Sequence, residues 1–242
     1  MARTRPPQRL DDIAEAALRV FLAKGYRLAR MEEVAREAGV SPGLLYSYTT
    51  GKEALYQLVL QRELGVDLSD AKLPIPKPDA TAVAALTKRA MREVGTIKAL
   101  DDALRTDQTA DARAEVEAIV GEHYDRLHRY RRFVRLAERS ALDWPELSEQ
   151  VYERGRRPFV KRLGEYIAGR VSTGHFAPVP DPHVAARFVI ETVAWFANHR
   201  YGDHDGASID DDVAKATVVQ LVATGLVGDA SRRRKRTRGS GR

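Results

Sequence analysis

The stretch GYRLARMEEVAREAGVSPGLLYSYTTGKE, residues 25–53, decides the fold of this chain. It predicts two short helices joined by a tight turn. In the first helix, about 31–38, apolar residues recur with the spacing of one buried helical stripe. Gly39 ends that helix, because glycine tolerates a positive φ just after a helix C-terminus. Ser41 is the expected N-cap of the second helix, about 42–48.

A helix, a glycine-containing turn and a short second helix together form a helix-turn-helix. In that motif the second helix enters the DNA major groove, where exposed side chains read base edges. Helical periodicity points Leu45 inward and leaves its neighbours facing outward. The residues expected at DNA are Arg30, Tyr46 and Lys52 on phosphates, Gly43, Leu44, Ser47 and Tyr48 at base edges, and Ser41 and Pro42 at the start of the helix.

The segment AGVSPGLLYSYTTGKEAL resembles the tetracycline-repressor (TetR) family motif, roughly AGVSxGxLYxYFxxKExL, and the specific resemblance covers about residues 8–60. The resemblance implies an all-α protein with an N-terminal three-helix helix-turn-helix DNA-binding domain. It also implies a larger helical C-terminal domain for ligand binding and dimerisation. A small-molecule effector bound in that domain is expected to shift the DNA-reading heads.

Three positions depart from the family pattern. Thr49 stands where an aromatic residue is common, so we expect looser packing under the end of the second helix. Gly51 precedes Lys52 without a side-chain acceptor for a cap. Ala29 and Arg30 replace the usual Thr/Ser pair, which removes a cap from the first helix of the motif but adds a cation near the phosphates.

The chain divides into four expected regions, namely a flexible basic arm (1–8), the helix-turn-helix domain (9–65), a helical ligand-binding and dimerisation domain (66–228) and a disordered basic tail (229–242). Three prolines in 69–79 predict a linker there. Helical patterns fill the remainder, at about 10–24, 52–65, 80–93, 95–106, 111–139, 145–171, 181–200 and 210–227. Because no alternating period-2 pattern or hairpin signal appears, the fold class is all-α.

The distribution of charge indicates where DNA contacts arise. The chain carries a net charge of +6, with +2 in residues 1–60, −2 in 61–228 and +6 in 229–242. The arm, through Arg3 and Arg5, and the tail can each add phosphate contacts or remain solvated segments. Without cysteines, a signal-peptide pattern or a long apolar run, we expect a cytoplasmic protein with no membrane partner.

The last two predicted helices are apolar around most of their circumference, which requires burial on several sides. A homodimer would provide that burial, and the resemblance implies a four-helix bundle across a two-fold axis. The alternative is burial within one subunit. The expected interface residues are Val184, Phe188, Val193, Phe196, Val218, Leu221 and Val222.

An effector pocket needs apolar walls and a few polar anchors. The candidate lining residues are Tyr124, His128, Phe133, Trp144, Tyr152, Phe159, Tyr166 and Trp195, each of which also fits an ordinary core position. Arg126 and Arg129 can anchor an acidic effector or form a solvated helix face.

Signals for other chemistry are weak. His123 and His128 have a poor spacing for a metal, and the loop from His199 to Asp205 is better explained as a polar connection than as a dedicated metal site. No catalytic triad or phosphate-binding loop is recognisable. We therefore expect no metal, no cofactor and no enzymatic activity.

The sequence predicts a DNA-binding transcriptional regulator, most readily a ligand-released repressor that binds a palindromic operator as a dimer. One alternative is a sequence-tolerant DNA-packaging protein that uses the same heads and basic tail. The acidic middle of the chain argues against wrapping DNA. A helical enzyme with an incidental helix-turn-helix is the third hypothesis, and it lacks a credible catalytic group.

Overall fold

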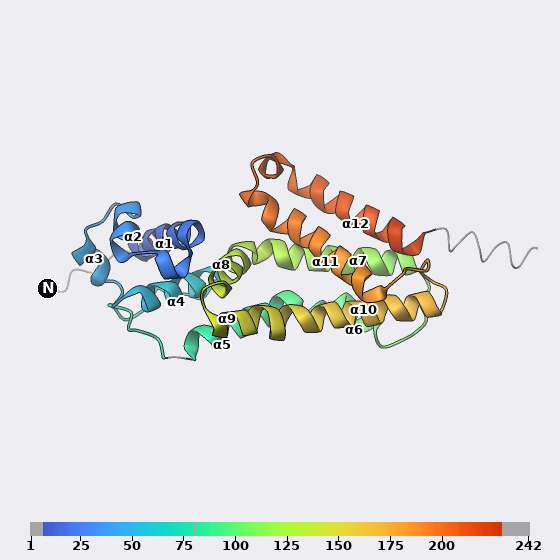
Figure 1. The fold of residues 1–242 in the computed structure, drawn as a ribbon. Coiled ribbons are helices and arrows are strands. Elements are labelled where there is room, and N and C mark those ends of the chain that lie inside the picture. The colour runs from blue at the N-terminus through green and yellow to red at the C-terminus, as the bar shows by residue number, and fades with distance from the viewer. Residues whose placement is uncertain (1–6, 80, 229–242) are drawn as a thin grey trace, which may run out of the picture. The chain divides into compact units, whose positions relative to one another are not determined.

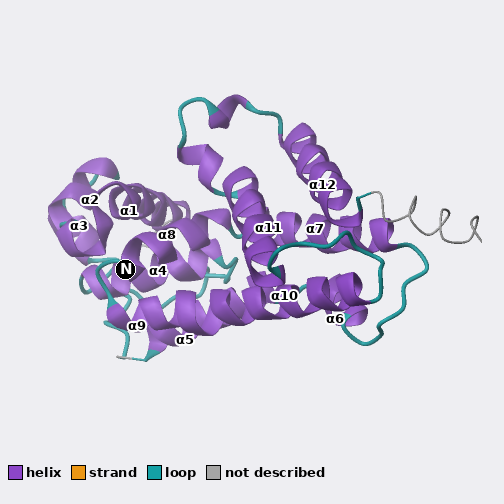
Figure 2. Ribbon diagram, turned by 45° about the vertical axis from the view of Figure 1, so that its right-hand side comes forward, coloured by secondary structure: helices purple, strands orange, loops and turns teal. Residues whose placement is uncertain are grey.

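In the computed structural model, which describes residues 7–79 and 81–228, helices joined by loops make up the molecule (Figure 2). These residues contain no β-strand, and their one isolated β-bridge pairs Thr49 with Ile75. The all-α fold class is confirmed. Among the described helices, none combines the length and the hydropathy needed to cross a bilayer.

The N-terminal helices are α1 (Pro7–Leu28), α2 (Met31–Glu37), α3 (Pro42–Tyr46), α4 (Lys52–Glu63) and α5 (Ala82–Gly95) (Figure 1). The following helices are α6 (Lys98–Ala103), α7 (Ala112–Arg129), α8 (Arg131–Ala141), α9 (Pro145–Ser148), a π-helical segment η1 (Glu149–Arg156) and α10 (Arg157–Ser172). The C-terminal part contains α11 (Pro182–Ala197), short 3₁₀ turns η2 (His199–Gly202) and η3 (Gly206–Ser208), and α12 (Asp211–Val227).

The chain forms two compact units, and each unit is built from two separate stretches of the sequence. Among the described residues, the first unit comprises those up to Met91 together with Arg132–Arg154, and the second comprises Arg92–Arg131 together with 155–228. The helix-turn-helix therefore shares its unit with α8 and α9. The segment 69–79 is non-helical, as its prolines predict, and its Ile75 pairs with the end of the helix-turn-helix.

The core of the first unit forms where α1 packs on α2 and α4. The expected stripes of α1 and α4 are buried, with Ile13, Ala16, Ala17, Phe21, Leu55, Leu58 and Val59 at 0% exposure. The arm was predicted to extend to residue 8, but α1 already begins at Pro7. The rest of the arm and the tail (229–242) lie outside the described residues.

Gly25 interrupts α1, as the sequence predicts, with φ 80° and ψ 159°, and one further turn then extends to Leu28. Only glycine adopts this backbone conformation readily. A Cβ atom at Gly25 would also lie 2.8 Å from the Arg139 guanidinium and 2.9 Å from the Asp143 carboxylate. Gly25 thus allows α1 to approach the α8–α9 segment closely.

Two long helices expected from the sequence are broken. The segment 111–139 divides at Tyr130, which has φ −98° and ψ 13°, into α7 and α8. The segment 145–171 divides into α9, η1 and α10. In the first case the apolar pattern continues across the break, but the two helices belong to different units, a difference that local periodicity does not encode.

In the second unit α7 and α10 both pack on α11, while α12 packs on α7 and α11. Figure 1 shows α11 and α12 as a neighbouring pair joined through η2 and η3. Buried aliphatic side chains from all four helices fill the layer between them, including Val120, Leu163, Ile190 and Val218.

We expect Gly25→Ala to lower the free energy of unfolding by about 1–3 kcal/mol, because alanine would have to adopt a backbone conformation that is unfavourable for a residue with a Cβ atom. Urea titration followed by circular dichroism measures the change. Gly43→Ala is the matched control, since a Cβ there meets nothing within 4 Å. Equal stability of the two variants would contradict the requirement for glycine at position 25.

Candidate DNA-reading surface

The first helix of the helix-turn-helix, α2, buries Met31, Val34 and Ala35. Gly39 has φ 64°, and the Val40 N–H donates to the Ala35 carbonyl at 2.9 Å, which closes the helix end as predicted. The N-terminus of α2 is also capped despite the absence of Thr or Ser.

The carboxylate of Glu33 accepts a hydrogen bond from the Arg30 backbone N–H at 3.2 Å, which is half of a capping box. Glu33 also pairs with the ammonium of Lys24. The expected loss of a cap at α2 is therefore compensated from inside the helix, and the Arg30 side chain remains exposed.

The second helix, α3, is only five residues long. The Ser41 hydroxyl accepts a hydrogen bond from the Leu44 N–H at 3.2 Å, which confirms the predicted N-cap. Leu45 is fully buried, whereas Leu44 and Tyr46 are 40% and 46% exposed. The Ser47 hydroxyl donates to the Leu44 carbonyl at 2.7 Å. The outer side of α3 therefore presents the side chains of Leu44 and Tyr46.

Tyr48 was predicted to face outward, and this prediction is wrong, since its exposure is 2%. The helix ends at Tyr46, so helical periodicity no longer orients the residue. The Tyr48 carbonyl accepts from the Ile75 N–H at 2.8 Å, and the Thr50 N–H donates to the Ile75 carbonyl at 3.0 Å. Thr49 is fully buried beside this bridge, so the segment around Ile75 covers the end of α3.

Lys52 was expected to reach a phosphate, but its ammonium already has protein partners. It donates to the Arg27 and Ala29 carbonyls, both at 3.1 Å, and lies 4.8 Å from the centre of the Tyr26 ring. These contacts satisfy the carbonyls at the C-terminal end of α1. Burial and the charge of Glu53 raise the pKa of Tyr26 to about 12, so its phenol hydroxyl stays protonated and the residue stays uncharged beside Lys52.

The eight candidate effector residues are not brought together in one place. Phe133, Trp144 and Tyr152 belong to the first unit, whereas Tyr124, His128, Phe159, Tyr166 and Trp195 belong to the second. Trp144 stacks on Tyr26 with ring centres 4.8 Å apart. Tyr166 donates to Glu115 at 2.8 Å, and Trp195 is 37% exposed. Most of these side chains therefore already have structural contacts.

His123 is not among the effector residues expected from the sequence, but its environment is unusual. It is 5% exposed, and neither ring nitrogen has a hydrogen-bond partner within the described structure. Its ring lies 4.7 Å from that of Phe159, and burial lowers its pKa to about 4. Asn198 is also buried with both side-chain polar atoms unpaired. The position of His123 within the apolar stripe of α7 was the available sequence signal.

In the loop that follows α11, the Asp203 side chain forms hydrogen bonds with the backbone of the same loop. The Asp203 carboxylate accepts from the N–H groups of Asp205 and Gly206 at 2.9 and 2.8 Å. In the described part of the chain, no three His, Asp or Glu side chains are grouped as metal ligands.

The seven expected dimer-interface residues divide by exposure. Val193, Val218 and Val222, which were expected at a dimer interface, are buried within the chain and offer little surface to a second subunit. Val193 and Val218 contribute to the helix layer of the second unit, and Val222 also lines a groove between α11 and α12. Phe196 is partly buried.

Val184, Phe188 and Leu221 are 68%, 66% and 65% exposed on α11 and α12. They line a groove of 410 Å³ together with Pro180 and Leu226. The described part of the second unit therefore presents an apolar surface along α11 and α12.

Comparisons with known proteins agree with this architecture. A family model described as bacterial regulatory proteins of the tetR family matches residues 13–59, and a model of the AefR-like transcriptional repressor C-terminal domain matches residues 127–226. The HTH-type transcriptional activator FasR of Mycolicibacterium smegmatis is 42% identical over 57 residues, covering 24% of this chain and 26% of that protein.

The uncharacterized HTH-type transcriptional regulator TtgW of Pseudomonas putida is 44% identical over 48 residues, covering 20% of this chain and 36% of that protein. The chain thus spans only about a quarter to a third of the curated relatives that it matches.

Solved structures extend the likeness over nearly the whole chain. The ketosteroid regulator KstR2 of Mycobacterium tuberculosis has a TM-score of 0.52 at 16% identity, with 94% of this chain and 99% of that chain covered. The regulator PfmR of Thermus thermophilus has a TM-score of 0.52 at 19% identity, with 89% and 96% covered. At these identities the likeness establishes the fold. None of these matches supports a DNA-packaging protein; with a matching head, C-terminal domain and fold, the chain belongs to the TetR family of DNA-binding transcriptional regulators.

Proposed function

We propose that this regulator is a ligand-released repressor that binds a palindromic operator as a homodimer. The observation that carries the proposal is the capped α3 helix with its exposed Leu44 and Tyr46. An apolar side chain at Leu44 suits a thymine methyl group, and the Tyr46 hydroxyl suits a phosphate or a base edge. The segment 9–65 acts as the DNA-binding part of the chain.

The residues proposed at DNA follow from their exposure. Ser41, Pro42 and Gly43 form the exposed start of α3, and Arg30 supplies an exposed cation beside α2. No acidic residue occurs in the whole segment 38–52, so carboxylates of this segment do not repel phosphate. Ser47 and Lys52 are proposed to lie at the edge of the DNA-contacting surface. Tyr48 is buried and is proposed to support α3 rather than to contact DNA.

The dimer is proposed to form through α11 and α12. Val184, Phe188, Val213 and Leu221 are each more than 60% exposed on these helices. An apolar patch of this kind on a soluble protein marks an interaction surface. In a two-fold dimer each protomer offers the same patch, so the protruding Phe188 of one protomer can fill the groove beside Leu221 of the other.

The effector is proposed to bind in the second unit beside His123. Burying an unpaired polar group costs about 1–3 kcal/mol, and a ligand that pairs with it recovers that cost. Because the imidazole is neutral at pH 7, it offers one donor and one acceptor. Phe159 provides an apolar wall. This chemistry favours an uncharged, mainly apolar effector with a hydroxyl or carbonyl group.

Selection of bound duplexes from a random DNA library, at physiological salt with bulk competitor DNA, tests the function. We expect an enriched palindrome, since a two-fold dimer reads two related half-sites. On the selected duplex, Tyr46→Ala should weaken binding by about 1 kcal/mol, roughly fivefold, through loss of a hydrogen bond. Tyr46→Phe separates the hydroxyl from the ring. Binding without enrichment would favour a sequence-tolerant DNA-binding protein instead.

Phe188→Asp should abolish the dimer, because it would bury an unpaired carboxylate in an apolar contact at a cost of about 3 kcal/mol or more. Sedimentation velocity measures the mass in solution. Leu142→Asp is the matched control, since Leu142 is 73% exposed on the first unit. A dimer that survives Phe188→Asp would exclude this face as the interface.

His123→Phe should leave the free energy of unfolding unchanged or raise it by about 1 kcal/mol, because it replaces unpaired polar atoms with apolar ones. We also expect 1-decanol, used as a neutral probe, to raise the melting temperature of the unmodified protein but not that of His123→Phe. His199→Phe, at an exposed position, is the control. Equal stabilisation of both variants by the alcohol, or a stronger effect of decanoate, would refute the proposed site.

A further inference from the structure

The chain passes from the second unit to the first between two consecutive arginines. Helix α7 ends at Arg129, Tyr130 is non-helical, and α8 begins at Arg131. Arg131 is the last residue of the second unit on this passage, and Arg132 is the first residue of the first unit. The two neighbouring side chains bind groups in different units.

Arg131 is held by the second unit. Its guanidinium lies 4.8 Å from the centre of the Tyr201 ring and donates to the His128 carbonyl at 2.9 Å. The Tyr201 hydroxyl donates to Asp211 at 2.6 Å, and the fully buried Arg200 also pairs with Asp211. Arg131 therefore rests on a polar cluster that joins α7, η2 and α12.

The chain also passes between the units in α5, between Met91 and Arg92. Tyr130, the residue that follows α7, contacts a residue close to this second boundary. The Tyr130 hydroxyl donates to the Glu93 carboxylate at 2.7 Å, and Arg126 donates to the Glu93 carbonyl at 3.1 Å. Glu93, the second residue of the second unit after this passage, is thus held at the C-terminal end of α7.

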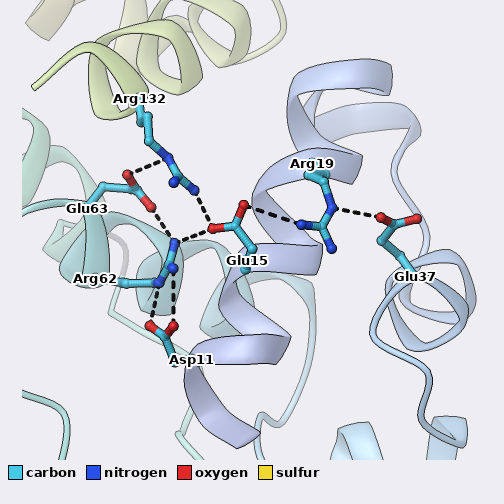
Figure 3. Close-up of polar contacts among 7 residues, drawn as sticks. All are labelled: Asp11, Glu15, Arg19, Glu37, Arg62, Glu63 and Arg132. Atoms are coloured by element: carbon cyan, nitrogen blue, oxygen red, sulfur yellow. Dashed lines mark hydrogen bonds and ion pairs between the residues drawn. The ribbon is translucent and has the colours of Figure 1, made fainter. Parts of the chain in front are cut away.

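Arg132 is held by the first unit. Its guanidinium pairs with Glu15 of α1 and, at 3.1 Å, with Glu63 of α4 (Figure 3). Arg62 binds the same two carboxylates, each at 2.7 Å, and also Asp11 at 2.6 Å. Two arginines therefore share three carboxylates contributed by α1 and α4.

The environment lowers the pKa of two of these carboxylates, whereas burial raises the pKa of Glu63 despite the nearby charges of Arg132 and Arg62. A hydrogen bond from Arg62 holds the pKa of Asp11 below its ordinary value. Burial acts to raise the pKa of Glu15, but hydrogen bonds from Arg132 and Arg62 outweigh it and lower that pKa. Arg19 extends the network by joining Glu15 to Glu37 at the end of α2 (Figure 3). The ion pairs thus link α8 to α1, α2 and α4.

Apolar contacts make α8 part of the DNA-reading unit as well. Phe133, the next residue of α8, is fully buried. After α8, Trp144 stacks on Tyr26 and contacts Tyr56 of α4 with ring centres 5.7 Å apart. A displacement of the start of α8 therefore acts on helices α1 and α4, on which α2 and α3 depend.

We propose that the Tyr130–Arg131–Arg132 turn is the relay through which the second unit controls the DNA-reading helices. This relay rests on the proposed ligand-responsive function and specifies how that response reaches α3. A shift at the end of α7 moves the start of α8, and the Arg132 ion pairs transmit the shift to α1 and α4. Coupling of this kind requires a contiguous physical connection between two parts that have alternative arrangements.

Hydrogen–deuterium exchange on the free, full-length protein tests the relay without DNA or effector. Tyr201→Phe removes the hydroxyl that binds Asp211 and thereby perturbs the platform under Arg131. We expect it to speed amide exchange in α1 and α4 at least threefold. The control is Tyr166→Phe, whose hydroxyl binds Glu115 in the same unit but does not contact the turn.

Combining Tyr201→Phe with Arg132→Met distinguishes transmission from simple loss of stability. With Arg132 replaced, Tyr201→Phe should no longer change exchange in α1 and α4. Arg19→Met, which cuts the same network but leaves the α8 contacts intact, should preserve the response. Should Arg132→Met fail to fold, Arg132→Lys serves instead, because the ammonium keeps the charge but lacks the planar fork with which the guanidinium orients Glu15 and Glu63.

Two results would overturn the relay. One is unchanged amide exchange in α1 and α4 of Tyr201→Phe, and the other is faster exchange caused by Tyr201→Phe even when Arg132 is replaced. Neither outcome depends on finding an operator. A failure of the DNA selection would count against the proposed repressor alone, and a failure of the exchange experiment would count against the relay alone.

Discussion

A recognition helix of five residues cannot maintain its own structure, and the first unit is built around that constraint. Helix nucleation is unfavourable, and isolated helices shorter than about 12 residues are marginal in water. The α3 helix is held instead by the Ser41 cap, by the buried Leu45 and by Tyr48 and Thr49 below its end. The Ile75 segment pairs with Tyr48 and Thr50 and closes this support. These contacts cover the inner side of α3 and leave Leu44 and Tyr46 exposed on its other side.

The same constraint explains why α8 belongs with the helix-turn-helix. A three-helix head of this size has a small core, so added burial contributes much of its stability. Phe133 and Trp144 extend the apolar contacts of α1 and α4, and Gly25 permits the close approach. Arg62 and Arg132 neutralise carboxylates that would otherwise add negative charge to a DNA-binding unit. The α8–α9 segment therefore both adds apolar burial to the first unit and reduces the negative charge on it.

The second unit combines two features that suit a regulator. Its outer helices α11 and α12 expose large apolar side chains around a groove, which suits a stable contact with a second copy. Its interior contains the unpaired His123, an arrangement that is costly in a protein with no ligand. Family members bind DNA and effectors and act as dimers, and these two features are the sites that we propose for dimerisation and for effector binding in this chain.

Much of the fold followed from the sequence because the relevant signals are local. Gly39 and the Ser41 cap fixed the helix-turn-helix turn, and the apolar stripes of α1 and α4 identified their buried faces. The positions of helices were predicted well for the same reason. The boundaries failed where distant contacts decide them, as at Tyr130, which separates α7 from α8 although the apolar pattern continues.

What only the tertiary structure decided is the partner of each side chain. Periodicity placed Tyr48 at the DNA, whereas pairing with Ile75 buries it. Residue type made Trp144 a pocket candidate, whereas Tyr26, more than a hundred residues earlier in the chain, stacks on it. The sequence by itself determined the helix-turn-helix, the all-α class and the apolar C-terminal helices, because backbone propensity and hydrophobic spacing act over a few residues. Which charges and rings meet depends on segments far apart in the chain, and only the packed structure determines that.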